Sequence, residues 1–187
     1  MKTIAHSTLI ALAIAAGATS GSASAITGTS SVQATFTSTV TAGTCTAQIQ
    51  NTGGQPISTL AFGDVFKSDL VTNSRSEAFK IAFSGCAGVK SATVQATPGT
   101  GGECTGSAKD GDSFSAGLGA GFEVWKGAAA SGTLLSCKTK PTQTVNISGA
   151  TAKLDLAARI VLGKGKTIAD VTTGDVSAPV TFVVTYQ

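Results

Sequence analysis

The chain has 187 residues, with 13 lysine and arginine side chains against 10 aspartate and glutamate side chains, and aromatic residues make up 5% of it. Its basic side chains are scattered, so it lacks the basic stripe and stacking aromatics of a nucleic-acid-binding surface, and we expect no nucleic-acid partner. The composition is rich in Thr, Ser, Gly, Ala and Val, which is typical of an all-β sandwich.

Residues 1–25 predict a secretory signal peptide. Lys2 supplies a positive start, an apolar segment spans residues 9–16, and Ala23-Ser-Ala25 has the A-x-A pattern of a cleavage site. We expect cleavage after Ala25, with Ala23 as the alternative, and a net charge of about +2 for residues 26–187. We therefore expect an exported product with a single domain.

The only histidine, His6, lies within the predicted signal peptide. The exported chain therefore lacks the histidine of Ser-His-Asp and Cys-His catalytic sites and of histidine metal sites. Asp110 and Asp112 flank Gly111, a pattern more typical of a turn than of a calcium site. We expect no enzymatic activity, no metal and no cofactor.

The first exported segment alternates weakly, with Ile26, Gly28, Ser30, Val32, Ala34 and Phe36 on one face. Further strands are expected at residues 39–49, 57–66 (with a break at Gly63), 78–84, 89–97, 121–125, 133–137, 145–147 and 153–162. Residues 98–121 are glycine-rich and predict a flexible loop with Phe114 turned inward. Trp125, the only tryptophan, is expected in the core. Strands at this spacing, with little helix, favour a β-sandwich.

The C-terminal segment from Gly174 to Gln187 carries the clearest alternation, with apolar residues at every second position. Such a strand has one buried face. Because no charged residue follows it, its edge would need a covering partner, although an ordinary sandwich edge is the alternative.

Four cysteines remain after the predicted cleavage, at positions 45, 86, 104 and 137. An even number in an exported protein predicts two disulfides with three possible pairings, and their order along the chain favours Cys45–Cys86 and Cys104–Cys137. No C-x-x-C spacing points to a metal or redox site.

These features together resemble the pilus subunits of the chaperone–usher pathway, the type 1 pilin-like family. The most specific part is the tail, with its penultimate Tyr186, the alternation before it, and Gly174 at the fourteenth position from the end. Cys45 is similar to the cysteine of the family's A strand, and residues 78–86 to its B strand with the partner cysteine Cys86. Residues 58–65 are similar to the family's Leu-Gly-x-Val segment.

The resemblance implies an incomplete immunoglobulin-like β-sandwich that is completed by donor-strand complementation. It divides the chain into a signal peptide (1–25), a donor-strand extension (26–36) and a pilin domain (37–187). The donor residues would be Ile26, Gly28, Ser30, Val32 and Ala34, with Gly28 at a constricted pocket. The groove that accepts a chaperone strand or a donor strand would be walled by Gly174, Val176, Ala178, Val180, Phe182, Val184 and Tyr186, with Phe36 and Val40 opposite.

We therefore expect a structural subunit of an adhesive fimbria that polymerises by donor-strand exchange on the bacterial surface. Its implied partners are a periplasmic chaperone, an outer-membrane usher and neighbouring subunits, and its route runs through the periplasm to the cell surface. The alternative is a subunit that itself binds a host receptor through residues 98–140, where a second disulfide would rigidify the surface. The simpler interpretation of that disulfide is loop stabilisation, and an enzyme is the remaining alternative.

Overall fold

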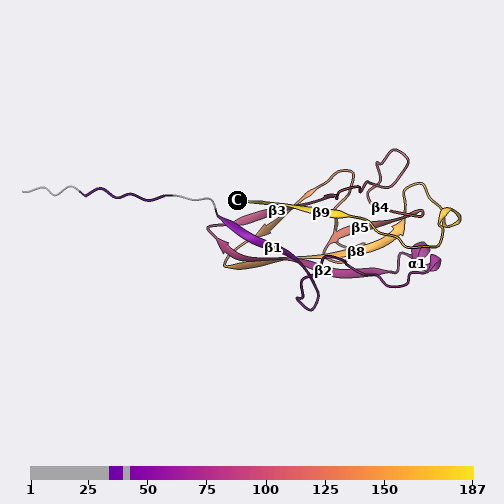
Figure 1. Cartoon of the computed structure of the whole chain (residues 1–187), viewed down its shortest axis with the longest axis horizontal. Helices are drawn as coiled ribbons and strands as arrows, with labels where there is room; N and C mark the ends of the chain where they lie inside the picture. Colours follow the sequence, from indigo (N-terminus) through magenta and orange to yellow (C-terminus); the bar gives the residue numbers. More distant parts are fainter. Residues whose placement is uncertain (1–33, 40–42) are drawn as a thin grey trace, which may run out of the picture. The chain divides into compact units, whose positions relative to one another are not determined.

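The computed structural model of the chain describes residues 34–39 and 43–187 (Figure 1). The chain divides into two units, Met1–Thr39 and Val40–Gln187, and the fold described here is that of the second. The predicted signal peptide and donor residues Ile26, Gly28, Ser30 and Val32 lie outside the described residues, whereas Ala34 is described and exposed. Among the residues that are described, no helix has the length and apolar character to cross a membrane.

The second unit consists of two antiparallel sheets (Figure 1). The larger sheet has the strand order β1 (Thr44–Asn51), β2 (Ser76–Ala87), β8 (Thr151–Leu162), β5 (Ala120–Lys126) and β4 (Phe114–Gly117), with β6 (Thr133–Leu134) also paired to β5. The smaller sheet has the order β7 (Thr142–Asn146), β3 (Ser91–Pro98) and β9 (Val180–Tyr186). One short helix, α1 (Lys67–Thr72), and one 3-10 turn, η1 (Ile168–Asp170), complete the described elements.

The core lies between the sheets and follows from the period-two pattern of the strands. Alternate residues of the long strands are buried, namely Phe79, Ile81 and Phe83 of β2 and Leu154, Leu156, Ala158 and Ile160 of β8. Ala92, Val94 and Ala96 of β3 face them and are almost fully buried. The all-β sandwich predicted from the sequence is confirmed.

Two disulfides staple the sandwich, in the pairing that the order of the cysteines favours. Cys45–Cys86 joins the edge strand β1 to β2, and Cys104–Cys137 joins the long loop before β4 to the segment after β6. Cys137 is fully buried and Cys104 nearly so, so the second disulfide is part of the core as well as a loop closure.

Several expected elements are different in the structure. Residues 57–66 form no strand; they follow a single bridge between Gln50 and Pro56, are irregular, and lead into α1. Residues 98–121 contain β4 and the start of β5, and Phe114 is buried there as expected. The terminal strand begins only at Val180, because residues 174–179 make no ladder.

Trp125 is not in the core. Its neighbour Val124 points inward and is buried, so Trp125 takes the outer face of β5 and is half-buried. There its indole nitrogen donates to Glu123 (3.1 Å), which also accepts from Arg159 (2.6 Å), and the Arg159 guanidinium lies 5.3 Å from the ring centre. A partly buried ion pair therefore holds the tryptophan on the outer face.

Candidate functional site

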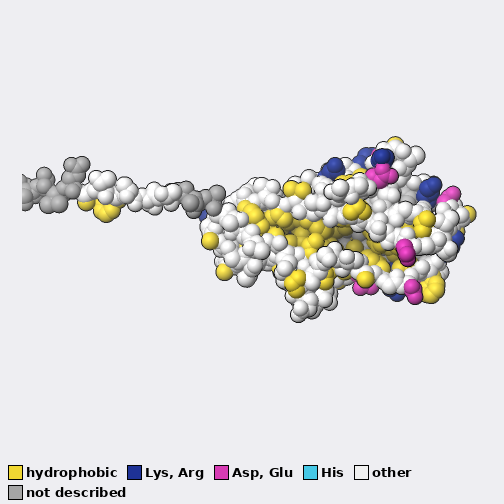
Figure 2. All heavy atoms as spheres, in the orientation of Figure 1, with side chains coloured by type: hydrophobic (Ala, Val, Ile, Leu, Met, Phe, Trp, Pro, Cys, Tyr) yellow, Lys and Arg dark blue, Asp and Glu magenta, His cyan; other side chains and the backbone are white. Residues whose placement is uncertain are grey.

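A groove of about 1120 Å³ lies open beside β9. Its floor is the hydrophobic core itself, because Phe79, Phe122, Val124, Ala158 and Ile160 of the larger sheet all line it. Figure 2 shows hydrophobic side chains gathered in this hollow between two ridges of mostly polar surface. Among the described residues the smaller sheet has three strands against six in the larger, so within this part of the chain some of the larger sheet's inner face has no strand above it.

One wall of the groove is β9 together with the chain that leads to it. Val180 and Phe182 line the groove, and Val184 and Tyr186 continue the same face against the core. Phe182 packs on Phe79 with ring centres 5.9 Å apart, and Tyr186 meets Phe83 edge-on at 6.5 Å. The outward residue between them, Val183, is 46% exposed.

Gly174, Val176 and Ala178 extend this wall beyond the strand, and all three line the groove. Val176 and Ala178 pack against a second core cluster that includes Leu70 and Ile160. Gly174 has a φ of +145°, and a side chain there would meet Leu118 Cδ1 at 2.9 Å, so the position favours glycine. Of the seven residues that the sequence assigns to the wall, five therefore line the groove, and Val184 and Tyr186 continue the strand against the core.

The side of the groove opposite β9 includes residues that the sequence did not indicate. Phe36 is 94% exposed and belongs to the N-terminal unit, and Val40 lies outside the described residues. Among the described residues of the second unit, this wall includes Ile49 of β1 and the irregular segment 57–66. That segment is held in place where Ile57 donates its N–H to the carbonyl of Ile49 (3.0 Å) and where Phe62 packs on Phe122 at 4.9 Å.

The backbone of β9 offers an unpaired edge along the groove. Gln187 and Ser91 exchange both backbone hydrogen bonds (2.8 and 3.1 Å), so this is a hydrogen-bonded pair of the β3–β9 ladder. Alternation then makes Val180, Phe182, Val184 and Tyr186 the non-bonded positions, whose N–H and C=O groups point away from β3. Within residues 43–187 no other strand pairs with β9. The residues whose side chains face the core are thus also those whose backbone groups face the open side.

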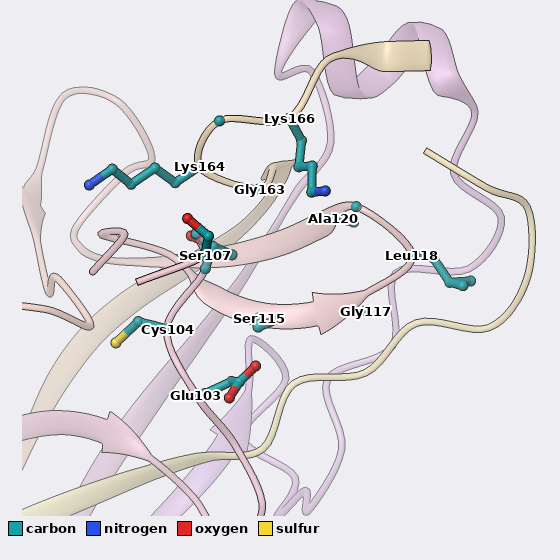
Figure 3. Close-up of a pocket in the computed structure, with 14 residues that line it drawn as sticks. Glu103, Cys104, Ser107, Ser115, Gly117, Leu118, Ala120, Gly163, Lys164 and Lys166 are labelled. Carbon is teal, nitrogen blue, oxygen red and sulfur yellow. The ribbon is translucent and has the colours of Figure 1, made fainter. Parts of the chain in front are cut away.

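A second, smaller recess of about 320 Å³ lies between the loop at 103–107, the β4–β5 hairpin and the turn at 163–166 (Figure 3). Its charged residues are mostly paired locally. Lys164 turns away from the recess (Figure 3) to Asp110 at 2.6 Å, and Glu103 pairs with Lys109 at 2.7 Å. The ammonium of Lys164 lowers the pKa of Asp110, and the carboxylate of Glu103 raises the pKa of Lys109. The recess lies partly in the region 98–140 that the receptor-binding alternative invokes and partly at the turn 163–166.

The floor of the groove is the part of the site that sequence reasoning missed. Phe79, Val124 and Ile160 lie in strands that were predicted, and their alternation marks them as inward-facing. The pattern of each strand gives its buried face but not how many strands cover that face. The open floor is recognised only from the number of strands in each sheet, and that number is known only once the sheet topology is known.

No protein-family model matches the chain. An Escherichia coli (strain K12) protein, the uncharacterized fimbrial-like protein YadL, is 38% identical over 172 residues, covering 85% of this chain and 86% of that protein. The chain belongs to the fimbrial-like proteins. As a member of this family it is a pilus subunit, and the family resemblance inferred from the tail and the cysteines is confirmed.

Two solved structures support the fold of this fimbrial protein. The P pilus rod subunit PapA superimposes with a TM-score of 0.50 at 20% identity, over 76% of this chain and 99% of that one. A subunit from a chaperone–usher pilus whose structure was studied for rod uncoiling superimposes with a TM-score of 0.53 at 19% identity, over 84% of this chain and 96% of that one. At these identities the likeness shows the fold alone, which is the immunoglobulin-like sandwich of pilus subunits.

Proposed function

We propose that this fimbrial subunit polymerises by strand exchange, in which residues 26–36 of one copy fill the groove beside β9 of the next. The observation that carries the proposal is the coincidence of an open strand edge and an uncovered core at the same place. An added strand would pair with the edge of β9 and cover the groove floor in one step, which is the general mode of strand addition.

The geometry makes such an addition favourable. Four residues of β9 turn an N–H and a C=O toward the groove, which offers up to eight hydrogen bonds at about 1 kcal/mol each. Burial of apolar side chains on Phe79, Phe122 and Ile160 adds about 25 cal/mol for each Å² removed from water. Both contributions require that the occupant alternate, with its apolar residues facing the floor.

The sequence of the extension suits this role. In the proposed register Ile26, Val32 and Ala34 face the floor, and Gly28 occupies the narrowest part of the groove. An exposed hydrophobic groove is an aggregation hazard before assembly. We therefore assign its first occupant to a strand of a periplasmic chaperone, with an outer-membrane usher as the site of exchange and the periplasm as the export route. Nothing in this role requires catalysis.

A donor-strand peptide tests the proposal directly. A synthetic peptide of residues 26–36 should bind the monomeric chain and stop fibre growth in a dose-dependent way. The matched control is the same peptide with Val32→Asp, which places a charge on the apolar floor and should bind at least about tenfold more weakly. Equal inhibition by both peptides, or none by either, would contradict strand exchange at this groove.

The family membership does not favour the receptor-binding alternative over the structural role. The recess near Lys164 is polar, and the described part of the chain holds no cluster of three or more side chains suited to a metal ion. We therefore assign the primary function to the groove, with the Cys104–Cys137 disulfide as a stabiliser of the loop.

A further inference from the structure

Two large hydrophobic side chains are exposed where the groove meets α1. Phe66 is 70% exposed and Val71 is 59% exposed. Phe66 directly precedes α1 and lines the groove mouth, and Val71 lies five residues along the chain, about 7 Å along the helix axis. Figure 2 shows hydrophobic side chains protruding at the end of the molecule where Figure 1 places α1. The exposed side chains of Phe66 and Val71, with the start of α1 between them, are here called the α1 patch.

Local structure does not explain a phenylalanine at position 66. It is the N-cap of α1, where Ser, Thr, Asp or Asn would accept a helix N–H and phenylalanine makes no such bond. The cap is satisfied from the other side, because Asp69 accepts the N–H of Phe66 (2.9 Å), which lowers the pKa of that carboxyl group. Leu70 is buried and anchors the helix. The ring of Phe66 contributes to neither the cap nor the core.

The direction of the donor strand decides what lies beside this patch. Antiparallel pairing is slightly more stable per residue than parallel pairing, so a strand added to β9 is expected to run antiparallel to it. Such a strand enters beside Tyr186 and leaves past Val180 toward residues 171–178 and α1, which form that end of the groove. The folded domain of the donating copy then follows at the α1 end.

The linker keeps that domain close. Seven residues, 37–43, separate the proposed donor strand from β1 at Thr44, and fully extended they reach about 25 Å. In the donating copy the chain enters the domain beside the turn after β2, where a side chain at Gly43 would collide with the backbone of Ala87. That turn is tied to the one before β8 by the bond from the Cys86 N–H to the Ala150 carbonyl (3.1 Å). The two turns expose small residues, namely Ala87, Gly88, Gly149 and Ala150.

We propose that the α1 patch of one subunit docks against the two turns around Ala87 and Ala150 of the copy that donates its strand. This inference rests on the proposed strand exchange and adds a second contact between successive subunits. The donated strand holds the copies together, and the contact of Phe66 and Val71 with these exposed small residues fixes the angle between them. Removal of the exposed apolar surface from water stabilises that angle.

Engineered disulfides test the contact in fibres of the full chain. The double variants F66C/A87C and F66C/A150C should give covalent ladders between successive subunits under mild oxidation, in at least one of the two. The control V183C/A150C moves the first thiol to an exposed position on the outer face of β9. The donor strand tethers successive subunits in both designs, so the two thiols have a similar effective concentration in each. Docking should therefore give roughly tenfold more crosslinked dimer with F66C than with the V183C control.

The outcomes separate the two proposals. Fibres that assemble but crosslink no better through F66C than through V183C would overturn the docking contact and leave strand exchange intact. If the peptide of residues 26–36 fails to block fibre formation, both the docking contact and strand exchange are overturned. As a second measurement, F66S/V71S should still fold and assemble, because serine is a better N-cap than phenylalanine and preserves the helix. Its fibres should have unchanged subunit content but a wider spread of angles between subunits. An unchanged spread would also count against docking.

Discussion

At the scale of single residues, parity along β9 decides what each position does. Phe182 and Val184 turn their side chains to the core and their backbone groups to the open edge. Thr181 and Val183 turn their side chains outward and their backbone groups to β3. Neighbouring residues of β9 therefore differ in role: the backbone groups of one bond to β3, and those of the next face the open edge.

Proline substitutions at two neighbouring positions test this assignment. V184P removes an N–H from the open edge, a place where edge strands tolerate proline, so the fold should survive while peptide binding weakens by about 1 kcal/mol or more. V183P removes an N–H from the β3–β9 ladder and should destabilise the domain itself. Urea unfolding and binding of the residue 26–36 peptide measure the two effects. Equal loss of stability in both variants would contradict the assigned parity.

At the scale of elements, strands with a clear apolar alternation were predictable and the segments between them were not. Residues 78–84 and 153–162 lie within β2 and β8 as predicted. These two strands pair with each other, and each buries alternate side chains. Residues 57–66 carry apolar residues at strand-like intervals, yet they line the groove without pairing to a neighbour. Residues 174–179 also line the groove without forming a ladder. At Pro179 the carbonyl accepts a hydrogen bond from the N–H of Gly99, but the ladder ends there because proline has no N–H to donate.

The glycine-rich loop shows a different limit. Glycines at 99–121 suggested flexibility, whereas the segment is held by Cys104–Cys137, by the buried bond between the hydroxyls of Thr105 and Ser113 (2.8 Å), and by the Lys164–Asp110 pair. Gly121 illustrates why glycine is needed there, because a side chain would meet Thr105 Cγ2 at 2.7 Å. Close packing, which a single sequence does not reveal, accounts for this glycine.

Removal of the second disulfide separates the loop from the groove. C104A/C137A should lower the free energy of unfolding by up to about 4 kcal/mol, as expected for opening a loop of 33 residues. The groove residues lie elsewhere, so binding of the residue 26–36 peptide and fibre formation should persist under conditions where the variant remains folded. Thermal unfolding and peptide titration measure these two properties. Loss of peptide binding in a folded variant would place the functional site in the loop instead.

At the scale of the whole molecule, the central feature is an unequal pair of sheets. In residues 43–187 six strands face three, and the part of the larger sheet that these residues leave uncovered forms the floor of a groove beside the edge of β9. The resemblance of the tail to pilus subunits predicted this groove and the residues of the β9 wall. It did not predict that Ile49 and residues 57–66 would line the other side of the groove.

The most direct test of the account compares the thermal unfolding of residues 26–187 with that of a version in which residues 26–36 follow Gln187 through a short linker. The relocated strand would return antiparallel along β9 and fill the groove of its own chain. Up to eight hydrogen bonds at about 1 kcal/mol each, with roughly 2–4 °C gained per kcal/mol, predict a midpoint higher by as much as about 30 °C and a monomeric protein. Equal midpoints would mean that the sandwich is already complete, which would contradict strand exchange as its function.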